Sequence, residues 1–473
     1  MSIAKNYFYN VVYQLTTIII PIITIPYVSR VLGSSGVGIN AYTNSIIQYF
    51  ILLGTIGISL YGNREIAYVR DDSTQLNKTF WGIFLLKLVT TFISFIFFLF
   101  FLGFVSNYRF ILLLQSIYIF AAAVDISWFY MGLEDFKKTV TRNIFVKITG
   151  VVCTFIFVKD SDDLWKYVLI LSSTQLLGNI SLWFYLPKTI KKIKLTFNDI
   201  RKHLVPSISL FIPQVAIQIY VVLNKTMLGA LSNPNEVGYF DNADRIIKIV
   251  LSFVTAMGTV MLPRVSNAFA KGNIGRVKKY VYNSFNFASF LSIPLMFGIV
   301  ATANEFAPWF FGPEFDKTGE LMVIISPIIV LIAWSNVIGN QFFMPTGQIK
   351  GYTISVVIGA IINFLLNLIL ISRYHSIGVA LSTLIAEFSV TAVQFYLARN
   401  DLKIKSMIYS TWKYFFCGFM MYLIIEYIGT FFENKLVTLI FQFLTGIVFY
   451  FSFLMLLKTK IIKNFIYHLS SRI

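Results

Sequence analysis

Long apolar runs recur along almost the whole chain, and they restrict its fold more than any other feature. Crossing the hydrocarbon core of a bilayer takes about 20 apolar residues as a helix. Inside lipid every backbone N–H and C=O group must be paired within the protein, so only helices and closed barrels span a membrane. The runs here are too long and too uniformly apolar for the alternating strands of a barrel. The sequence therefore predicts an all-α polytopic membrane protein.

Composition excludes a water-soluble globule, because 57% of the 473 residues are hydrophobic and only 13% are charged. The first run is longer than the core of a signal peptide and lacks a small-residue cleavage site, so we expect a retained helix. The apolar runs predict fourteen membrane-spanning helices, near residues 7–32, 39–61, 80–104, 109–132, 141–158, 166–187, 204–231, 237–262, 280–303, 319–343, 352–371, 377–398, 411–431 and 437–457.

Basic residues gather in alternate connections between these runs. One set of connections holds Lys5; Arg64, Arg70 and Lys78; Lys137, Lys138 and Arg142; Lys188 to Lys202; Arg264 to Lys279; Lys350; Arg399, Lys403 and Lys405; and Lys458, Lys460, Lys463 and Arg472. The other set holds little beyond Arg109, Lys159, Lys166, Lys317, Arg373 and Lys435. Cytoplasmic loops carry the excess of Lys and Arg, so both termini are expected in the cytoplasm. The net charge of +18 thus reports orientation and not a nucleic-acid partner.

Similar sequence stretches occur twice, about 200 residues apart. "YMGLEDFKKT" at 130–139 is matched by "FMPTGQIKGY" at 343–352, and "RVLGSSGVG" at 30–38 is matched by "TMLGALSNPNEVG" at 226–238. "WFYLP" at 183–187 is matched by "QFYLA" at 394–398. Chance similarity of apolar segments is the alternative explanation. The order and spacing favour six helices repeated as six helices, with two more at the end.

Because each half contains an even number of spans, both halves begin on the same side, and the repeats are parallel. Such repeats suit two lobes that rock during alternating access. We predict an N-lobe over residues 1–187, a basic cytoplasmic linker over 188–203, a C-lobe over 204–398, and two further helices with a tail over 399–473. The linker, "PKTIKKIKLTFNDIRKH" from residue 187, is expected to lie on anionic headgroups.

Polar residues inside the spans are candidates for a substrate cavity, since a charge in the bilayer centre costs at least ~2.5 kcal/mol. Gln214, Gln218 and Lys225 share one face of a predicted helix. The next helix carries two i, i+4 pairs, Asp241 with Arg245 and Asp244 with Lys248. These pairs either neutralise one another or contribute cations to the cavity, with Asp244 as a candidate for proton or cation coupling.

Further ionisable residues lie at single positions in the spans. Arg30, near the outer end of the first helix, either extends to the headgroups or binds an anion, because guanidinium groups match phosphate oxygens. Arg64 is either a cytoplasmic loop charge or a second anion ligand. Asp125 is expected far from helix ends, either in a buried pair with Lys147 or in a functional role. Two charges are expected to extend from helix ends, at Lys87 and Glu426, and one deeper carboxylate is a coupling candidate, at Glu387.

The fourteen spans, the parallel halves and the stretches "YVSRVLGSSGVGINAYTNSI", "GISLYGNREIA" and "DISWFYMGLEDFKK" resemble the polysaccharide repeat-unit flippases of the multidrug/oligosaccharidyl-lipid/polysaccharide exporter superfamily. The resemblance covers the first twelve predicted helices and is weaker in the last two. It implies transport of undecaprenyl-pyrophosphate-linked oligosaccharides from the inner to the outer leaflet of a bacterial plasma membrane, for capsule, exopolysaccharide or another surface glycan. Arg30, Arg64 and Lys225 match places where the family has basic cavity residues.

Teichoic-acid precursor flippases share this pattern and remain an alternative. A cation-coupled multidrug antiporter on the same fold is a second alternative, although cationic drugs favour an anionic cavity. The family role also implies a glycan polymerase and other assembly proteins as partners.

A membrane glycan polymerase or glycosyltransferase is disfavoured, because no connection is long enough to hold a catalytic domain. A P-loop pump is excluded, because no GxxxxGK[ST] motif occurs. No catalytic residue, cofactor or metal site is predicted; coupling to Na⁺ or H⁺ through Asp125, Asp244 or Glu387 is a hypothesis.

Overall fold

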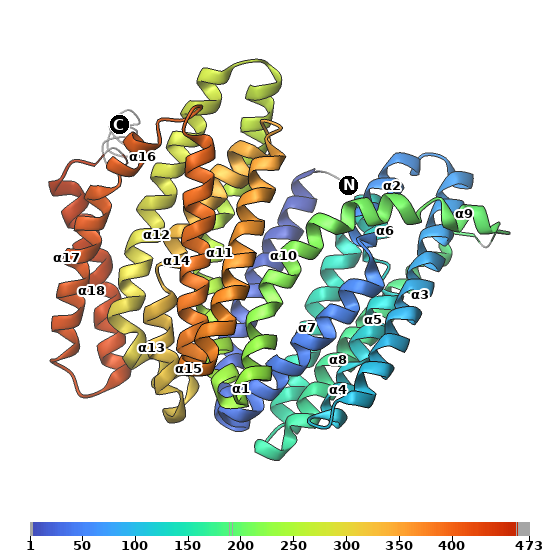
Figure 1. Ribbon diagram of the computed structural model, residues 1–473, viewed down its shortest axis with the longest axis horizontal. Helices are drawn as coiled ribbons and strands as arrows, with labels where there is room; N and C mark the ends of the chain where they lie inside the picture. Colours follow the sequence, from blue (N-terminus) through green and yellow to red (C-terminus); the bar gives the residue numbers. More distant parts are fainter. Residues whose placement is uncertain (1–2, 189, 192, 460, 462–473) are drawn as a thin grey trace. The chain divides into compact units, whose positions relative to one another are not determined.

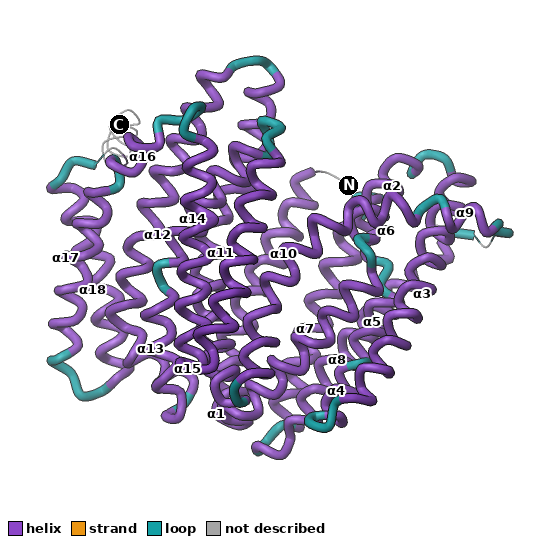
Figure 2. Tube along the Cα trace, viewed as in Figure 1, coloured by secondary structure: helices purple, strands orange, loops and turns teal. Residues whose placement is uncertain are grey.

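The computed structural model describes residues 3–188, 190–191, 193–459 and 461. The side chains of residues 3–15, 17–18, 187–188, 210, 212–217, 219–221 and 259 lie outside the described part. Within it, the chain forms helices and short connections and no strand (Figure 2). The predicted all-α class is confirmed. Contacts divide the chain into two compact units, Met1–Gly238 and Tyr239–Ile473; the predicted lobe boundaries stay a prediction.

The first unit is built from ten α-helices of very different length (Figure 1). They are α1 (Ile3–Thr55), α2 (Ile58–Val69), α3 (Ser73–Phe104), α4 (Arg109–Gln115), α5 (Ile117–Val124), α6 (Ser127–Gly132), α7 (Phe136–Phe157), α8 (Leu164–Ser181), α9 (Phe197–Arg201) and α10 (Leu204–Leu231). A single turn of 3₁₀-helix precedes α8 at Ser161–Asp163, and a longer 3₁₀ segment of seven residues follows it at Leu182–Lys188.

The second unit contains most of α11 (Pro234–Ala270) and the helices that follow it. These are α12 (Ile274–Phe311), α13 (Asp316–Ile325), α14 (Ile328–Ser335), α15 (Ile349–Ala398), α16 (Ile404–Tyr409), α17 (Trp412–Gly429) and α18 (Lys435–Leu456). A 3₁₀ turn at Pro313–Phe315 and a π-helical segment at Asn336–Phe343 flank α13 and α14.

All fourteen predicted spans fall on helical segments, but two pairs of spans form single long helices. Residues 7–32 and 39–61 lie largely in α1, which breaks at Gly33 with φ 69°. Residues 352–371 and 377–398 lie in α15, which breaks at His375 with φ 49°. Of the helices in the described residues, nine are long and apolar enough to cross a membrane, or ten if one bent pair is a single span. The number of crossings therefore stays a prediction.

The predicted span 109–132 is divided into α4, α5 and α6, and this changes the place of Asp125. Its backbone is extended, with φ −70° and ψ 116°, and it ends α5. Its carboxylate accepts hydrogen bonds from the Ser127 backbone N–H at 2.9 Å and from the Ser127 hydroxyl at 3.0 Å. The expectation that Asp125 lies far from helix ends is wrong, because the carboxylate satisfies donors at the start of α6.

Each unit has its own apolar core. In the first, Phe80 of α3 packs on Trp128 and Phe129 of α6, and the buried Tyr130 hydroxyl donates to the Leu182 carbonyl at 2.9 Å. In the second, α12, α17 and α18 share a core that includes Tyr414 and Cys417 (Figure 1). The two C-terminal helices thus pack on α12 and form part of the second unit.

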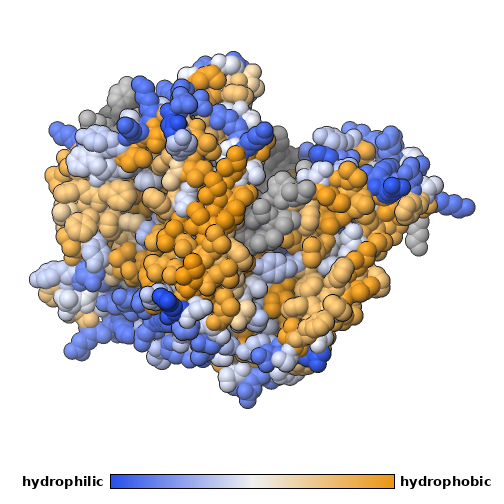
Figure 3. All heavy atoms as spheres, in the orientation of Figure 1, coloured by the Kyte–Doolittle hydropathy of each residue, from blue (hydrophilic) through white to orange (hydrophobic). Residues whose placement is uncertain are grey.

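The outer surface of the helices is apolar over their middle. In the second unit, hydrophobic residues cover the central part of the helices and hydrophilic residues gather at both ends (Figure 3). On α3 in the first unit, Phe92, Phe97 and Phe100 are all exposed. An apolar surface of this extent needs a partner, and a bilayer supplies it.

Candidate functional site

The repeated Val-Gly stretches pack directly on each other in the first unit. A Cβ atom added at Gly38 would lie 1.7 Å from the Pro234 carbonyl oxygen, and one added at Gly238 would lie 2.1 Å from the Ser34 carbonyl oxygen. The Ser34 hydroxyl also donates to Asn235 Oδ1 at 3.3 Å. Only glycine permits this close backbone approach. The contact places the end of α10, which precedes it in the chain, beside α1.

A second contact fixes the position of α10 along α1. The Thr226 hydroxyl lies 2.9 Å from Ser45 Oγ and 3.3 Å from the Tyr49 hydroxyl. One turn later, a Cβ atom at Gly229 would lie 2.1 Å from the Tyr42 ring. The side chain before Thr226 is the predicted cation Lys225, which is partly buried on α10.

The predicted cavity residues of this unit lie on three different helices. Arg30 is exposed on α1, three residues before the break at Gly33. Gln218 is exposed on α10, whereas the Gln214 side chain lies outside the described residues. Arg64 is on α2. α1 packs against α10, which brings the helices of Arg30 and Lys225 together, but a common cavity for these side chains stays a prediction.

Arg64 is part of a contact between α2 and the basic linker. Its guanidinium lies 2.9 Å from Glu65 Oε1 and over the rings of Tyr61 and Tyr68, at 5.6 and 5.9 Å from their centroids. The Tyr61 hydroxyl in turn lies 2.7 Å from Nδ1 of His203, the residue before α10. Arg64 is therefore both a surface cation and a neighbour of the point where the linker meets α2.

The linker is packed against α3 as well. The Trp81 indole N–H donates to the Lys191 carbonyl at 3.0 Å, and the Lys191 N–H donates to Asn77 Oδ1 at 2.8 Å. His203 is buried, and a Cβ atom at Gly82 would lie 3.0 Å from its ring. Burial, together with the charge of Lys202, lowers the pKa of His203 to about 4. The imidazole is thus neutral near pH 7 in this packed state.

A buried polar network lies at the break between α5 and α6. Asp125 Oδ1 is 3.7 Å from Arg142 Nη2, and the Asp125 carbonyl accepts a hydrogen bond from the Lys87 ammonium at 2.7 Å. Arg142 Nη1 donates to Asn179 Oδ1 at 2.5 Å, and the Asn179 amide donates to the Ala121 carbonyl. Charges in such a place must be paired.

Two sequence expectations are corrected by this network. Lys87 was expected to extend from a helix end but is only 1% exposed, because the backbone break at Asp125 offers it a carbonyl. Arg142 was expected among the cytoplasmic loop charges but is 8% exposed and pairs with Asp125. A buried pair of Asp125 with Lys147 was one of two expected roles of this carboxylate, and Arg142 takes the place of Lys147 in that pair. Lys147 contributes to the wall of a separate pocket of about 210 Å³ with Thr24 of α1.

Both predicted i, i+4 pairs on α11 are present in the structure. Arg245 Nη2 lies 2.7 Å from Asp241 Oδ2, and Lys248 Nζ lies 2.6 Å from Asp244 Oδ2. The two carboxylates are the buried partners, with side chains 0% and 11% exposed, while the cationic side chains are 36% and 49% exposed. The pairs therefore present positive charge outward from α11, and Asp244 is held as the carboxylate of a pair.

A buried amide cluster on α15 was not among the predicted site residues. Asn363 and Asn367 are both fully buried, and the Asn367 amide donates to Asn363 Oδ1 at 3.2 Å. Later on the same helix, the Gln394 amide donates to Ser355 Oγ at 3.1 Å, and Glu387 is partly buried. The i, i+4 spacing of two asparagines in an apolar run was the available signal.

The sequence pattern of a known family covers more than half of the chain. The family described as "Polysaccharide biosynthesis protein" matches residues 3–269. The chain belongs to this family. A second family, MatE, matches residues 210–369. The resemblance noted in the sequence is confirmed.

Named relatives agree with this assignment. The "Putative O-antigen transporter" of Escherichia coli (strain K12) is 26% identical over 408 residues, which cover 85% of this chain and 98% of the relative. The "Probable low-salt glycan biosynthesis flippase Agl15" of Haloferax volcanii is 26% identical over 174 residues, 37% of this chain and 36% of the relative.

Among solved structures, "Lipid II flippase MurJ, inward closed conformation" is similar with a TM-score of 0.76 at 19% identity, covering 97% of this chain and all of the other. This likeness shows a shared fold. The family protein is thus a multi-pass membrane transporter of the multidrug/oligosaccharidyl-lipid/polysaccharide type.

Proposed function

We propose that this family member is a lipid-linked glycan flippase, which moves undecaprenyl-pyrophosphate-linked oligosaccharide units from the inner to the outer leaflet of a bacterial cytoplasmic membrane by alternating access. The observation that carries the proposal is similarity to a named O-antigen transporter over nearly the whole length of that protein. In this proposal both termini lie in the cytoplasm, as the distribution of basic residues predicts. The glycan serves capsule, exopolysaccharide or another surface polymer, and a glycan polymerase takes the product.

The charges of the described residues support an anionic substrate. Arg30 and Lys225 lie on α1 and α10, which pack together, and α11 presents Arg245 and Lys248 outward from buried carboxylates. A polar oligosaccharide with two phosphates cannot cross hydrocarbon unaided, since each unpaired polar group costs several kcal/mol. Guanidinium and ammonium groups in an aqueous path replace part of the hydration of the pyrophosphate. Arg64, Gln214 and Gln218 are further proposed contacts.

Energy for the transport step comes from the membrane potential or from an ion gradient. Moving one charge across 100 mV corresponds to about 2.3 kcal/mol, and an outside-positive potential favours outward movement of an anion. Asp125, Asp244 and Glu387 are the proposed coupling residues. Asp125 and Asp244 each form an ion pair with a cation of the protein, so their coupling role would require that pair to open.

Two alternatives differ in substrate. A teichoic-acid precursor has the same lipid-phosphate chemistry and differs in its glycan. A multidrug antiporter is suggested by the MatE pattern over residues 210–369. Cationic drugs need exposed carboxylates, whereas the carboxylates of α11 are buried beneath their cationic partners.

The test is the accumulation of lipid-linked oligosaccharide in the inner leaflet of cells depleted of the protein. Rescue is compared for wild type, Arg30→Ala, Lys225→Ala and, as a control of equal charge change, Lys271→Ala in an exposed connection. We expect wild type and the control to clear the accumulated lipid and the other two variants to do so poorly. No accumulation on depletion, with altered sensitivity to cationic drugs instead, refutes the flippase and supports the antiporter.

A further inference from the structure

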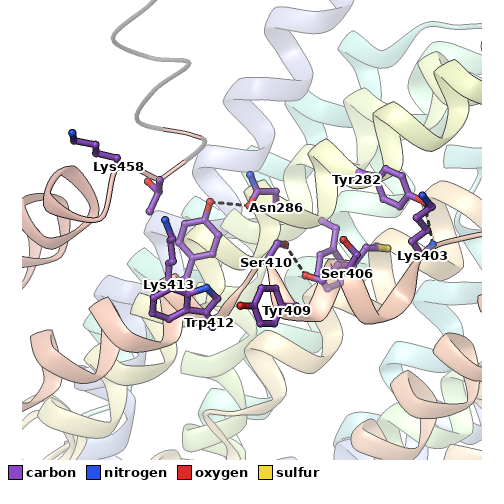
Figure 4. A pocket seen from close by; sticks show the side chains of 13 residues that line it. Tyr282, Asn286, Lys403, Ser406, Tyr409, Ser410, Trp412, Lys413 and Lys458 are labelled. Atoms are coloured by element: carbon purple, nitrogen blue, oxygen red, sulfur yellow. Dashed lines mark hydrogen bonds between the residues drawn. The ribbon is translucent and has the colours of Figure 1, made fainter.

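A pocket of about 540 Å³ opens at the C-terminal end of the second unit, and none of the candidate cavity residues described above lines it. Its walls come from the first part of α12, from α16, from the first turn of α17 and from the residues after α18 (Figure 4). Volumes of this size are typical of small-molecule sites. The pocket thus lies where four segments end or begin, at one end of the helices.

Positive charge dominates the pocket. Lys403, Lys413 and Lys458 line it from three different segments, and the described lining residues include no carboxylate. The Lys413 ammonium donates to the Leu457 carbonyl at 2.9 Å, which uses one of its three N–H donors. The carboxylate nearest to Lys403 in sequence, Asp401, accepts a hydrogen bond from Gln348 at 3.0 Å. Three lysines that line one pocket without an acidic partner among its described lining residues favour an anionic ligand.

Neutral polar groups complete the lining. The Thr459 side chain is 2% exposed, and its hydroxyl has no hydrogen-bond partner among the described residues. The Tyr282 hydroxyl oxygen accepts the Lys403 backbone N–H at 3.1 Å, so its own O–H can still donate. Ser406 lines the pocket from α16, and Ser410, the residue after α16, donates its hydroxyl to the Met407 carbonyl at 2.6 Å (Figure 4). A buried hydroxyl without a partner is costly, and an acceptor oxygen in the pocket removes that cost.

Aromatic residues place the pocket at the depth of lipid headgroups. Tyr409 is 77% exposed and Trp412 is 46% exposed, and both line the pocket beside the lysines (Figure 4). Tyr and Trp concentrate at membrane–water interfaces, where the ring meets the acyl chains and the polar edge meets the headgroups. A soluble anion has no apolar part that could contact these rings. The acyl chains of a lipid can contact them and continue along the apolar surface of α17 and α18.

We propose that this pocket binds the phosphate headgroup of an anionic bilayer phospholipid. The lysines neutralise the phosphodiester, the Thr459 and Tyr282 hydroxyls donate to its oxygens, and Tyr409 and Trp412 contact the first part of the acyl chains. Because the lining comes from α12, α16, α17 and the residues after α18, a bound lipid stabilises the C-terminal helix pair on α12. The proposal is independent of which glycan the protein transports.

The experiment measures thermal stability of the purified full-length protein in neutral detergent as phosphatidylglycerol is added, with phosphatidylethanolamine as the zwitterionic comparison. The pocket variant is Lys403→Gln/Lys413→Gln/Lys458→Gln. Its matched control, Lys194→Gln/Lys271→Gln/Lys350→Gln, removes three exposed lysines that lie outside the pocket and on the same predicted side of the membrane.

We expect phosphatidylglycerol to stabilise wild type and the control, and its half-saturating concentration to rise about hundredfold in the pocket variant, since each basic residue near anionic lipid contributes a factor of about five. Thr459→Val, which keeps all charges, is expected to weaken lipid binding several-fold. This single variant, read together with Lys413→Gln, tests the proposal if the triple variant does not fold.

Three results overturn the proposal. Equal weakening in the pocket variant and the control means that lipid attraction is spread over the surface. Equal stabilisation by inorganic phosphate means that the site takes a free anion. Stabilisation by polyprenyl pyrophosphate but not by phosphatidylglycerol assigns the pocket to the transported lipid. Failure of the flippase assay leaves each of these outcomes readable, because lipid binding is measured directly.

Discussion

A single methyl group added at Gly38 is expected to open the contact between the two Val-Gly stretches. The new Cβ atom would lie 1.7 Å from the Pro234 carbonyl oxygen, whereas carbon and oxygen atoms in contact are about 3.3–3.6 Å apart. The two backbones must therefore separate by about 1.6 Å or more. A flexible side chain cannot move aside here, since the blocking atom belongs to the main chain.

The expected cost follows from two opposing effects. Overpacking a closely packed contact costs about 1–3 kcal/mol, and replacing Gly by Ala within a helix recovers about 0.5–1 kcal/mol. The net loss is thus up to about 2.5 kcal/mol, and it lies toward the upper end because the blocking atom belongs to the backbone. For a unit of about 200 residues, each kcal/mol lowers the melting temperature by about 2–4 °C, so Gly38→Ala is expected to melt several degrees below wild type.

The assay is the loss of monodisperse protein after heating in detergent. Gly298→Ala on α12 is the control, because a Cβ atom there would have nothing within 4 Å and only the gain in helix propensity remains. We expect the control to melt at or slightly above the wild-type temperature. Equal melting of Gly38→Ala and wild type would refute the reasoning from backbone contact.

Three further predictions rest on buried groups. The pKa of His203, about 4, lies below the usual 6.5, so the neutral imidazole stabilises the packed linker fully above pH 6.5. As the pH falls from 6.5 toward 4, the linker loses up to about 3 kcal/mol of this stabilisation. Limited proteolysis of the linker should therefore accelerate over that pH range in wild type and lose its pH dependence in His203→Gln. Arg142→Met leaves Asp125 without its ion-pair partner and should lower the free energy of unfolding by about 3–5 kcal/mol, measured as a lower folded yield and melting temperature. The double variant Arg142→Met/Asp125→Asn should lose less stability, because both charges are then gone, and an equal loss would contradict the pairing. Arg245→Gln uncovers the fully buried Asp241, and adding Asp241→Asn should restore most of the melting temperature; no restoration would contradict the pairing.

Hydropathy was enough to predict the helices, because the energetic cost of an unpaired backbone in lipid leaves few other choices. The local breaks were harder to predict. At Gly33 the break coincides with a predicted turn, whereas at His375 a non-glycine residue takes a positive φ with little local signal. Asp125 shows the same difficulty, because its apolar neighbours contain no sequence signal for the end of a helix.

Some residues of the candidate site were predictable from the sequence and others were not. The pairs on α11 were predictable, since residues four apart on a helix always lie on one face. Lys87 and Arg142 were misplaced, because their partners come from helices distant in sequence.

The sequence by itself determined an all-helical membrane protein, because hydrophobic composition and helical period act locally and a bilayer permits few other backbone structures. Tertiary structure decided which polar groups meet. It brought Gly38 onto Gly238, paired Arg142 with Asp125, and gathered Lys403, Lys413 and Lys458 from three segments around one pocket. The physical reason is that burial and electrostatic pairing depend on distances across helices, and those distances are fixed only when the helices pack.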